Sequence, residues 1–394
     1  MSDIKIRIFE TGNPGNILAM YLTALKIKEY LPSASISHVD LPLFNIHCPD
    51  FDLGSTMGGL HDRFHNSGKR YSIVPVKGFA KWAMQTDAAF ISLEGLCQNI
   101  KNFPDRYLFN YDQHFPFSDK NTSFGGENDL VINIRGGEVL QGVSTLYPMI
   151  PIEFYKFLAQ KTKKHLIFYG QLDDSPYMEE LKSTFPNATY IASRGMEMDF
   201  DFLRKSKHLV MCISTFSWFA AWFSNAQKIY FPIAGTLNPA QHFYGNMLPL
   251  DDPRYEFFLF PVYDALPVKR YREYIDPVRN AWQHVSHDQL RGMMKRRSSN
   301  IEDYLLAFDP EFYISHYHEC RNIYNTWGNK GVVNFYLETG FFRGDFPCYV
   351  DRSFYTQNYP LAALEISQGI FENEVEHYIL RGQYQGYKPH AGCL

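Results

Sequence analysis

Apolar and polar residues alternate with a regular pattern between residues 129 and 233. Short apolar runs such as Leu130–Ile134 and His165–Tyr169 predict strands, whereas the spacing in Ile152–Thr162 predicts a helix. The pattern continues with helix Tyr177–Phe185, strand Thr189–Ala192, helix Phe200–Ser206, strand His208–Ile213, helix Trp218–Ser224 and strand Lys228–Phe231. Alternating strands and helices build a parallel sheet covered on both faces, so we predict a doubly wound α/β domain at about residues 126–290.

The N-terminal part begins in the same way. Ile4–Phe9 predicts a strand, the Gly/Asn-containing loop Glu10–Asn16 follows, and Ile17–Tyr30 has helical periodicity that stops before Pro32. A strand, a turn and a helix are the opening of a second α/β layer. The pattern over residues 35–125 is weaker. It predicts strands at Tyr71–Val74 and Ala88–Ser92 and a helix at Phe79–Gln85.

The C-terminal part contains an internal repeat over residues 309–347 and 351–389. Eight identical residues recur 42 positions apart without a gap: Asp309/Asp351, Phe312/Phe354, Tyr313/Tyr355, Tyr317/Tyr359, Tyr336/Tyr378, Gly340/Gly382, Gly344/Gly386 and Pro347/Pro389. Such self-similarity marks a repeated structural unit. We expect a helical tail over residues 301–394, each copy forming a hairpin whose glycines end a helix. Its role is packing or self-association, with glycan binding by Tyr313, Tyr336, Tyr355 and Tyr378 as the alternative.

Composition narrows the function classes. A chain of 394 residues with 45% hydrophobic and 20% charged residues is typical of a soluble globular protein of two or three domains. The net charge of −4 argues against a nucleic-acid partner, which normally requires a basic surface. Aromatic residues make up 16% of the chain. Filling of the core explains this high fraction more simply than stacking on sugars does.

Several features favour a cytoplasmic location. The six cysteines are scattered without a CxxC pair, the N-terminus has no signal-peptide hydrophobic region, and the longest apolar stretch, Leu209–Phe223, is too short to span a bilayer. The basic run Lys295-Arg296-Arg297 is most simply a solvated linker. The alternative is attraction to an anionic membrane, which would place the protein peripherally at its inner face.

The segment Lys207–Ile233 is the strongest candidate for chemistry. A strand runs into a Ser/Thr turn that opens a helix, and the next strand follows. The free N–H groups of a helix N-terminus suit phosphate, and Ser214, Thr215 and Ser217 add hydroxyl groups at the same place. Ordinary capping of the helix explains the same residues equally well.

Two further segments contain residues suited to phosphate. Arg135 ends a buried strand and precedes two glycines, and arginine binds phosphate through two parallel hydrogen bonds. The alternative is an ion pair between Arg135 and Glu138. In Asn13-Pro14-Gly15-Asn16, glycine permits close approach of the backbone to a ligand, although a plain tight turn is the simpler explanation.

Together, these three segments resemble motifs of the α-1,2-fucosyltransferase family and its wider group of fucosyltransferases. The family's G-x-G-N turn is matched at Gly15 and Asn16, its H-x-R-R-x-D segment at Arg135 and Glu138, and its N-S-T-F-S-W-W motif at Ser214–Trp218. Asp199 and His208 match the lead-in to the third motif, and the resemblance covers roughly residues 4–235. The chain departs from the family where Asn133 replaces His, Gly136 replaces Arg, Ile213 replaces Asn and Phe219 replaces Trp.

The resemblance implies a GT-B-like α/β fold with two Rossmann-like lobes and a C-terminal helical repeat module. It places the acceptor on residues 1–125 and the nucleotide sugar on residues 126–295. It also implies inverting, metal-independent transfer of fucose or a related deoxysugar from a GDP-sugar to a hydroxyl of a surface polysaccharide or lipopolysaccharide glycan. The residues it assigns to donor binding are Gly15, Asn16, Asn133, Arg135, Asp199, Ser214, Thr215, Phe216 and Ser217.

Roles in catalysis are expected for Arg135, which would stabilise the departing diphosphate, and for Glu138, a candidate base whose alternative is pairing with Arg135. No metal is expected, because His61 and His65, like His316 and His318, have no third ligand at a suitable spacing. Two other functions stay open: transfer from another nucleotide sugar, and a non-catalytic glycan- or nucleotide-binding protein. The tail repeats resemble modules found beside bacterial glycan-building enzymes.

Overall fold

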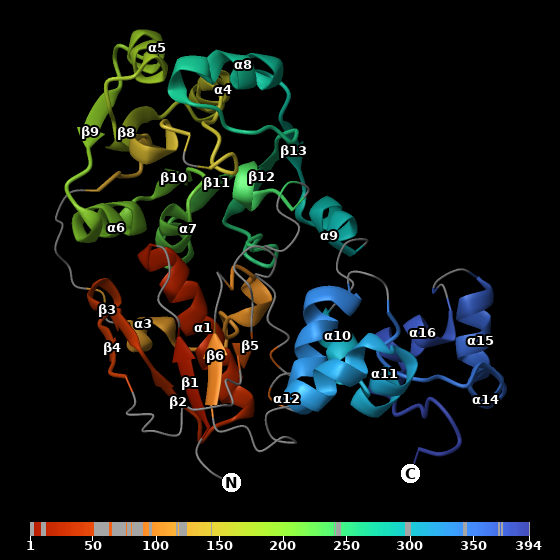
Figure 1. Cartoon of the computed structure of the whole chain (residues 1–394). Coiled ribbons are helices and arrows are strands. Elements are labelled where there is room, and N and C mark those ends of the chain that lie inside the picture. The colour runs from red at the N-terminus through yellow and green to blue at the C-terminus, as the bar shows by residue number, and fades with distance from the viewer. Residues whose placement is uncertain are drawn as a thin grey trace.

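The computed structural model describes residues 4–8, 13–50, 63–64, 76, 80, 90–93, 97–115, 117, 124–142, 144–239, 241, 246–295, 301–341, 345–368, 371 and 373–393. We call the described residues up to 117 the first lobe, residues 124–295 the second lobe, and the residues from 301 onward the tail. Both lobes are α/β units built on a sheet, and the tail is helical (Figure 1).

The first lobe is built on a parallel four-stranded sheet in the order β2-β1-β6-β5. Its strands are β1 (Lys5–Ile8), β2 (Ser35–Ser37), β5 (Arg63–Phe64) and β6 (Phe90–Leu93). Helix α1 (Pro14–Tyr30) packs against the hairpin of β3 (Val39–Leu41) and β4 (Ile46–Cys48), and the short helix α3 (Tyr111–His114) completes the lobe. The predicted strand-turn-helix opening is therefore confirmed, although α1 begins three residues early because Asn13 caps it and Pro14 suits a first turn.

Parts of the N-terminal prediction need qualification. The strand expected at Ala88–Ser92 is β6, displaced by one or two residues to Phe90–Leu93. The strand expected at Tyr71–Val74 lies outside the described residues, as does most of the helix expected at Phe79–Gln85.

The second lobe contains a seven-stranded sheet in the order β13-β12-β11-β10-β7-β8-β9, parallel except for β13. Its strands are β7 (Asp129–Arg135), β8 (His165–Gln171), β9 (Thr189–Ala192), β10 (His208–Val210), β11 (Lys228–Ile233), β12 (Tyr255–Leu259) and β13 (Gln283–Val285). Helices α4 (Ile152–Thr162) and α5 (Pro176–Thr184) cover one face, and α6 (Met196–Lys205) and α7 (Thr215–Trp222) cover the other (Figure 1). This arrangement confirms the predicted doubly wound sheet.

The chain reverses its direction across the sheet at β7. From β7 it moves through β8 to β9, and it then returns to the opposite side of β7 to form β10, β11 and β12. This reversal puts α4 and α5 on one face and α6 and α7 on the other, because parallel crossovers are right-handed. The neighbouring strands β7 and β10 therefore mark the topological switch point, where open α/β sheets bind their ligands.

Three predicted boundaries around this point are wrong. Strand β10 ends at Val210 instead of Ile213, α6 begins at Met196 instead of Phe200, and α7 begins at Thr215 instead of Trp218. The polar turn Ser214–Ser217 thus belongs largely to the first turn of α7, because Ser214 caps the helix from the position before it. Strands β12 and β13 follow the last strand predicted from the pattern.

The two copies of the tail repeat share two hydrogen bonds between equivalent residues. The Asp309 amide donates to the Pro347 carbonyl oxygen, and 42 residues later the Asp351 amide donates to Pro389. Likewise the Tyr317 hydroxyl accepts from the Phe346 amide at 2.8 Å, as the Tyr359 hydroxyl does from Lys388. The first copy contains α11 (Pro310–His316) and α12 (Glu319–Phe335), and the second contains α14 (Arg352–Asn358), α15 (Pro360–Ser367) and α16 (Glu374–Leu380).

The repeated tyrosines fill the interior of the tail. Tyr313, Tyr336 and Tyr355 are completely buried, which makes them core residues and leaves them no surface for a glycan. Tyr378 is partly buried and packs on the apolar cluster of the second copy. Helix α10 (Ile301–Leu306) lies between the copies, and its residue Tyr304 packs on both of their apolar clusters. Helix α9 (His287–Lys295) precedes it, and the basic run that Lys295 begins continues outside the described residues.

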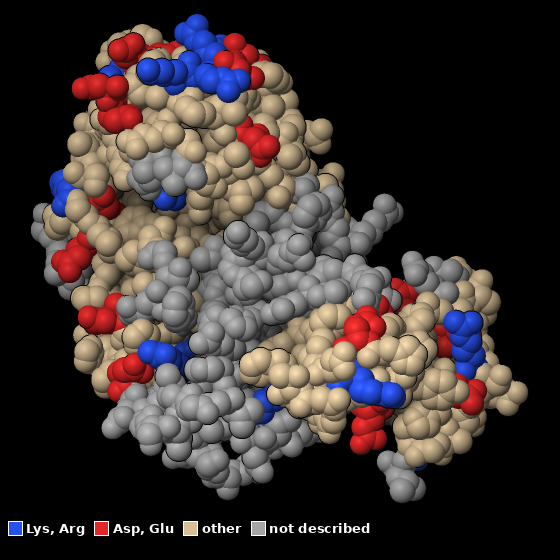
Figure 2. All heavy atoms as spheres, in the orientation of Figure 1, with Lys and Arg blue, Asp and Glu red and all other residues tan. Residues whose placement is uncertain are grey.

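Charged side chains of both signs are interspersed over the second lobe on the face shown in Figure 2. Several of them form ion pairs with one another, such as Arg270 with Glu273 at 2.6 Å. Within the described ranges, no helix is both long enough and apolar enough to cross a membrane.

Replacing Gly382 by Ala should loosen the second repeat. An added Cβ would lie 2.0 Å from the Tyr355 hydroxyl oxygen, which also contacts His377 Nδ1 at 2.9 Å. Overpacking of this kind costs about 1–3 kcal/mol, so amide hydrogen exchange should accelerate in peptides covering residues 351–389. In a Tyr355→Phe background, which removes the clashing oxygen, the added effect of Gly382→Ala should be smaller. An equal effect in both backgrounds would contradict the explanation.

Candidate functional site

The candidate site is the crevice at the switch point between β7 and β10. Asn133 and Arg135 from the end of β7, and Cys212 and Ile213 after β10, line a narrow pocket there. The segment Tyr147–Ile150 forms another part of its lining. The pocket holds about 10 Å³, which is room for a single water molecule.

A buried polar bridge joins the two strands that form the crevice. The side-chain amide of Asn133 donates to the Tyr169 carbonyl oxygen on β8 at 3.1 Å, and its oxygen accepts from the Cys212 thiol at 2.9 Å. Burial raises the pKa of Cys212 to about 11, and the nearby Arg135 charge opposes that shift. Cys212 therefore remains a protonated thiol at neutral pH and acts as a hydrogen-bond donor.

Arg135 ends β7 with its guanidinium 4.8 Å from the centre of the Tyr147 ring, a cation–π contact. The adjacent Gly136 packs against β8, where an added Cβ would lie 2.5 Å from the Gln171 carbonyl oxygen. A longer side chain at position 136 would require the backbone to shift, so a second arginine directly after Arg135 does not fit there. The side chain of Glu138, the expected base, lies outside the described part of the structure.

The N-terminus of α7 is capped and buried. The Ser214 hydroxyl accepts from the Phe216 amide at 3.2 Å, and the Ser217 hydroxyl accepts from the Cys212 amide at 3.3 Å. Ser214, Thr215 and Ser217 are each at most 3% exposed. These contacts support the capping interpretation for Ser214. The hydrogen bond of Ser217 stabilises the turn between β10 and α7.

The N-terminus of α1 lies directly against that of α7, so the first and third motifs meet. The Thr215 hydroxyl is 3.3 Å from the side-chain oxygens of both Asn13 and Asn16, and Asn16 also accepts from Gln98 at 3.0 Å. An added Cβ on Gly15 would lie 2.8 Å from the Thr215 hydroxyl oxygen. Glycine at position 15 is therefore required by helix-on-helix contact.

Two positive helix ends meet at this junction. Each helix N-terminus carries roughly half a positive charge, and the side-chain oxygens of Asn13 and Asn16 partly compensate it. Arg135 adds a full charge close enough to affect the pKa of Cys212, two residues before the cap of α7. The junction therefore favours an anion, although the 10 Å³ pocket admits a diphosphate only after its walls move apart.

Two of the expected donor-binding residues, Asp199 and Phe216, make their contacts outside the crevice. The Asp199 carboxylate accepts from the Tyr169 hydroxyl at 2.6 Å and from the Arg194 amide at 2.8 Å, which fixes the loop between β9 and α6. The ring of Phe216 packs edge-to-face on Phe200, with centroids 5.5 Å apart. Asn133, Arg135, Cys212 and Ile213 thus line the crevice, and the capped start of α7 at Ser214 directly follows Ile213. Gly15 and Asn16 contact Thr215 in the first turn of α7.

The sequence analysis missed four residues that shape the site: Asn13, Gln98, Tyr147 and Cys212. Asn13 and Cys212 lie inside the motif segments and were detectable as polar neighbours of candidate residues. Gln98 and Tyr147 lie in segments without regular periodicity, so no sequence pattern indicated them. Of the histidine pairs, His61 and His65 lie outside the described residues, and His316 stacks on Phe312 with centroids 5.1 Å apart.

No family model matches the chain. No curated protein matches it either. Among solved structures, a point mutant of Arabidopsis thaliana FUT1 in complex with GDP has 12% identity and a TM-score of 0.36, with 58% of this chain and 70% of that chain covered. The E. coli heptosyltransferase WaaC with ADP has 9% identity, a TM-score of 0.34, and coverage of 75% and 100%. A family 9 glycosyl transferase from Veillonella parvula has 11% identity, a TM-score of 0.32, and coverage of 75% and 97%. These similarities are distant, so the proposal below is based on the geometry of the crevice.

Replacing Gly15 by Ala should push α1 away from α7. The new methyl group would approach the Thr215 hydroxyl oxygen at 2.8 Å and the Phe216 amide nitrogen at 3.1 Å. The amide nitrogen belongs to the backbone of α7, so it cannot yield without moving that helix. The expected loss is about 1–3 kcal/mol, measured as a lower thermal midpoint and faster hydrogen exchange at both helix N-termini. Gly126→Ala is the matched control, because its nearest neighbour atom, Asp129 Oδ2, lies 3.5 Å away. Equal stability of the two variants would refute the close-packing argument.

Proposed function

We propose that this protein is a glycosyltransferase of GT-B type that uses a nucleotide-sugar donor. The observation that carries the proposal is the convergence of Arg135 and the N-terminus of α7 at the switch point of the seven-stranded sheet. A guanidinium and a helix N-terminus both favour an anion, and the switch point is the position where a doubly wound sheet binds its ligand.

The same groups suit the chemistry of sugar transfer. When the bond between the sugar and the diphosphate breaks, negative charge grows on the departing phosphate oxygens. Arg135 and the amides at the start of α7 would stabilise that charge without a metal ion. Direct displacement with inversion also requires a base for the acceptor hydroxyl, and Glu138 is the candidate because it follows Arg135 by three residues.

The donor we favour is a GDP-sugar carrying fucose or a related deoxysugar, with a hydroxyl of a surface polysaccharide or lipopolysaccharide glycan as acceptor. The motifs at Gly15-Asn16, Arg135 and Ser214–Trp218 support this choice through their resemblance to the fucosyltransferase group. The packing of Gly136 against Gln171 leaves one arginine where that group has two. This difference makes another nucleotide sugar the first alternative.

A non-catalytic nucleotide- or glycan-binding protein is the second candidate. The contact of Thr215 with Asn13 and Asn16 favours it, because this contact covers the helix end that would receive the diphosphate. A glycosyltransferase with this site must separate α1 from α7 at every turnover to admit its donor. A binding protein does not need to repeat that separation, because it has no turnover.

A nucleotide screen followed by turnover assays separates these candidates. GDP, UDP and ADP are compared by thermal shift, since a ligand that binds only the folded state raises the midpoint. The corresponding nucleotide sugars are then incubated with and without glycan acceptors. We expect the largest shift with GDP and release of GDP from a GDP-sugar. Binding without any turnover would favour the non-catalytic candidate, and the absence of binding by all three nucleotides would refute the proposal.

Replacing Arg135 by Ala should lower kcat/KM for the nucleotide sugar by about 100- to 1000-fold, because a charged donor aimed at the leaving group contributes about 2.7–4 kcal/mol. The matched control is Arg270→Ala, which removes an exposed arginine that pairs with Glu273. Circular dichroism should show both variants folded. An Arg135→Ala enzyme with the kcat/KM of the control would exclude Arg135 from the donor site.

A further inference from the structure

A second, larger pocket lies between the two lobes, at the other end of α7. Its volume is about 420 Å³, within the range of small-molecule sites. Residues 100–107 of the first lobe form one wall, and residues 246–252 of the second lobe form the other. Trp222, the last residue of α7, lies between them, whereas the nucleotide crevice adjoins the first residues of that helix.

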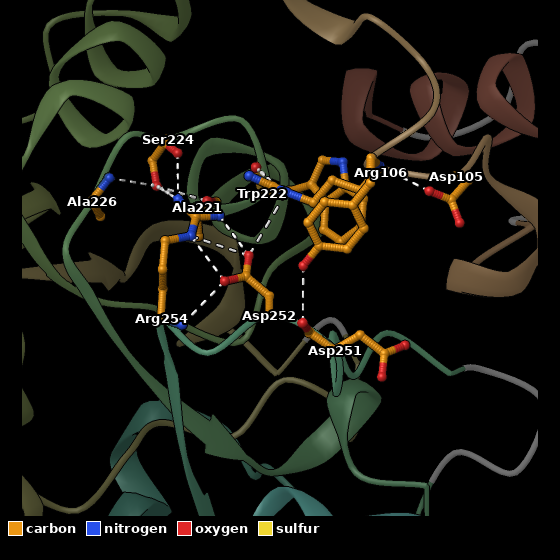
Figure 3. A network of polar contacts seen from close by, with 10 residues as sticks. Asp105, Arg106, Ala221, Trp222, Ser224, Ala226, Asp251, Asp252 and Arg254 are labelled. Atoms are coloured by element: carbon orange, nitrogen blue, oxygen red, sulfur yellow. Dashed lines mark hydrogen bonds and ion pairs between the residues drawn. The ribbon is translucent and has the colours of Figure 1, made fainter.

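The walls of this pocket are held in place by backbone and side-chain bonds between the lobes. The Ile100 amide donates to the Asn246 carbonyl oxygen at 2.7 Å, and the Asn246 amide donates to Gln98 at 2.9 Å. Arg106 binds the Trp222 carbonyl oxygen at the C-terminus of α7. Figure 3 shows Asp252 between Arg106 and Arg254, and Arg254 donates to Asp252 at 2.7 Å. The pocket is therefore preformed.

An aromatic and apolar surface lines part of the pocket. Phe103, Trp222 and Leu248 are buried in its floor, whereas Tyr107 is 70% exposed at its rim. The Tyr107 hydroxyl reaches across to the second lobe and donates to the Asp251 carbonyl oxygen at 2.9 Å, which fixes the ring in place. A fixed, exposed aromatic face suits the C–H face of a pyranose ring.

Hydrogen-bond donors and acceptors surround this aromatic surface. Lys101 and Arg106 offer donors, and Asn246 and the exposed carboxylate of Asp251 offer acceptors. The indole N–H of Trp222, which is 95% buried, has no acceptor among the residues that the structure describes. The ion pairs of Asp252 with Arg254 and of Asp251 with Arg291 balance much of the charge.

From this combination we infer that the pocket binds a neutral saccharide of one or two residues. Sugar hydroxyls both donate and accept, so they match a pocket that offers both donors and acceptors, and a sugar's apolar face matches the Tyr107 ring. The near balance of charge distinguishes this pocket from the nucleotide crevice, where Arg135 and two helix N-termini favour an anion. The site is complete without the crevice, so its occupancy does not depend on glycosyl transfer.

Saturation-transfer NMR on the full-length chain tests this inference with lactose, cellobiose and N,N′-diacetylchitobiose as probes. We expect at least one of these disaccharides to show transfer from the protein. Replacing Tyr107 by Ala should then weaken its binding about three- to tenfold, the equivalent of one aromatic contact. Tyr107→Phe, which keeps the ring but loses the bond to Asp251, should retain most of the affinity.

Tyr324→Ala is the matched control, because it removes another exposed tyrosine, on α12 of the tail. The inference is wrong if none of the three disaccharides shows transfer, or if Tyr107→Ala binds as well as Tyr324→Ala. The thermal shift produced by GDP should be the same in Tyr107→Ala and in the unmodified protein. Saccharide binding without any nucleotide binding would refute only the glycosyltransferase proposal. Nucleotide binding without any saccharide binding would refute only the saccharide pocket.

Discussion

The contact between the N-termini of α1 and α7 is the constraint on which the candidate site depends. Gly15 leaves no space between the two helices, and the Thr215 hydroxyl joins Asn13 and Asn16 to the turn that follows β10. Two partial positive charges are thereby held together, which is unfavourable unless oxygen atoms or an anion compensate them. The same contact buries the N-terminus of α7, where we propose that the donor phosphates bind.

The strands around the crevice are fixed independently of that contact. Asn133 ties β7 to β8 and to Cys212, so the position of Arg135 depends on a buried hydrogen-bonded network within one lobe. Buried networks of this kind are rigid when every member has a partner. Separation of the lobes would therefore uncover the start of α7 while leaving Arg135 in place.

Local patterns predicted the second lobe well. Helix α4 and strand β9 have the predicted bounds, because each has a clear period and a clear stop. Patterns alone did not indicate that Asn16 would accept a hydrogen bond from Thr215, 199 residues away. The motif residues lie in local turns that the sequence indicates, but their burial depends on packing between lobes. The inter-lobe pocket was missed for the same reason, since its walls come from irregular segments at residues 100–107 and 246–252.

The tail has a different kind of organisation, because each copy closes its own hydrogen bonds from Asp309 to Pro347 and from Asp351 to Pro389. A unit that begins and ends on a bond between its own termini can be duplicated in tandem without disturbing its neighbours. Tyr304 on α10 contacts the apolar clusters of both copies and acts as their common anchor. Gene duplication that adds a copy would therefore lengthen this tail, whereas the first copy is held to the lobes by Val333 and Leu337, which belong to their hydrophobic core.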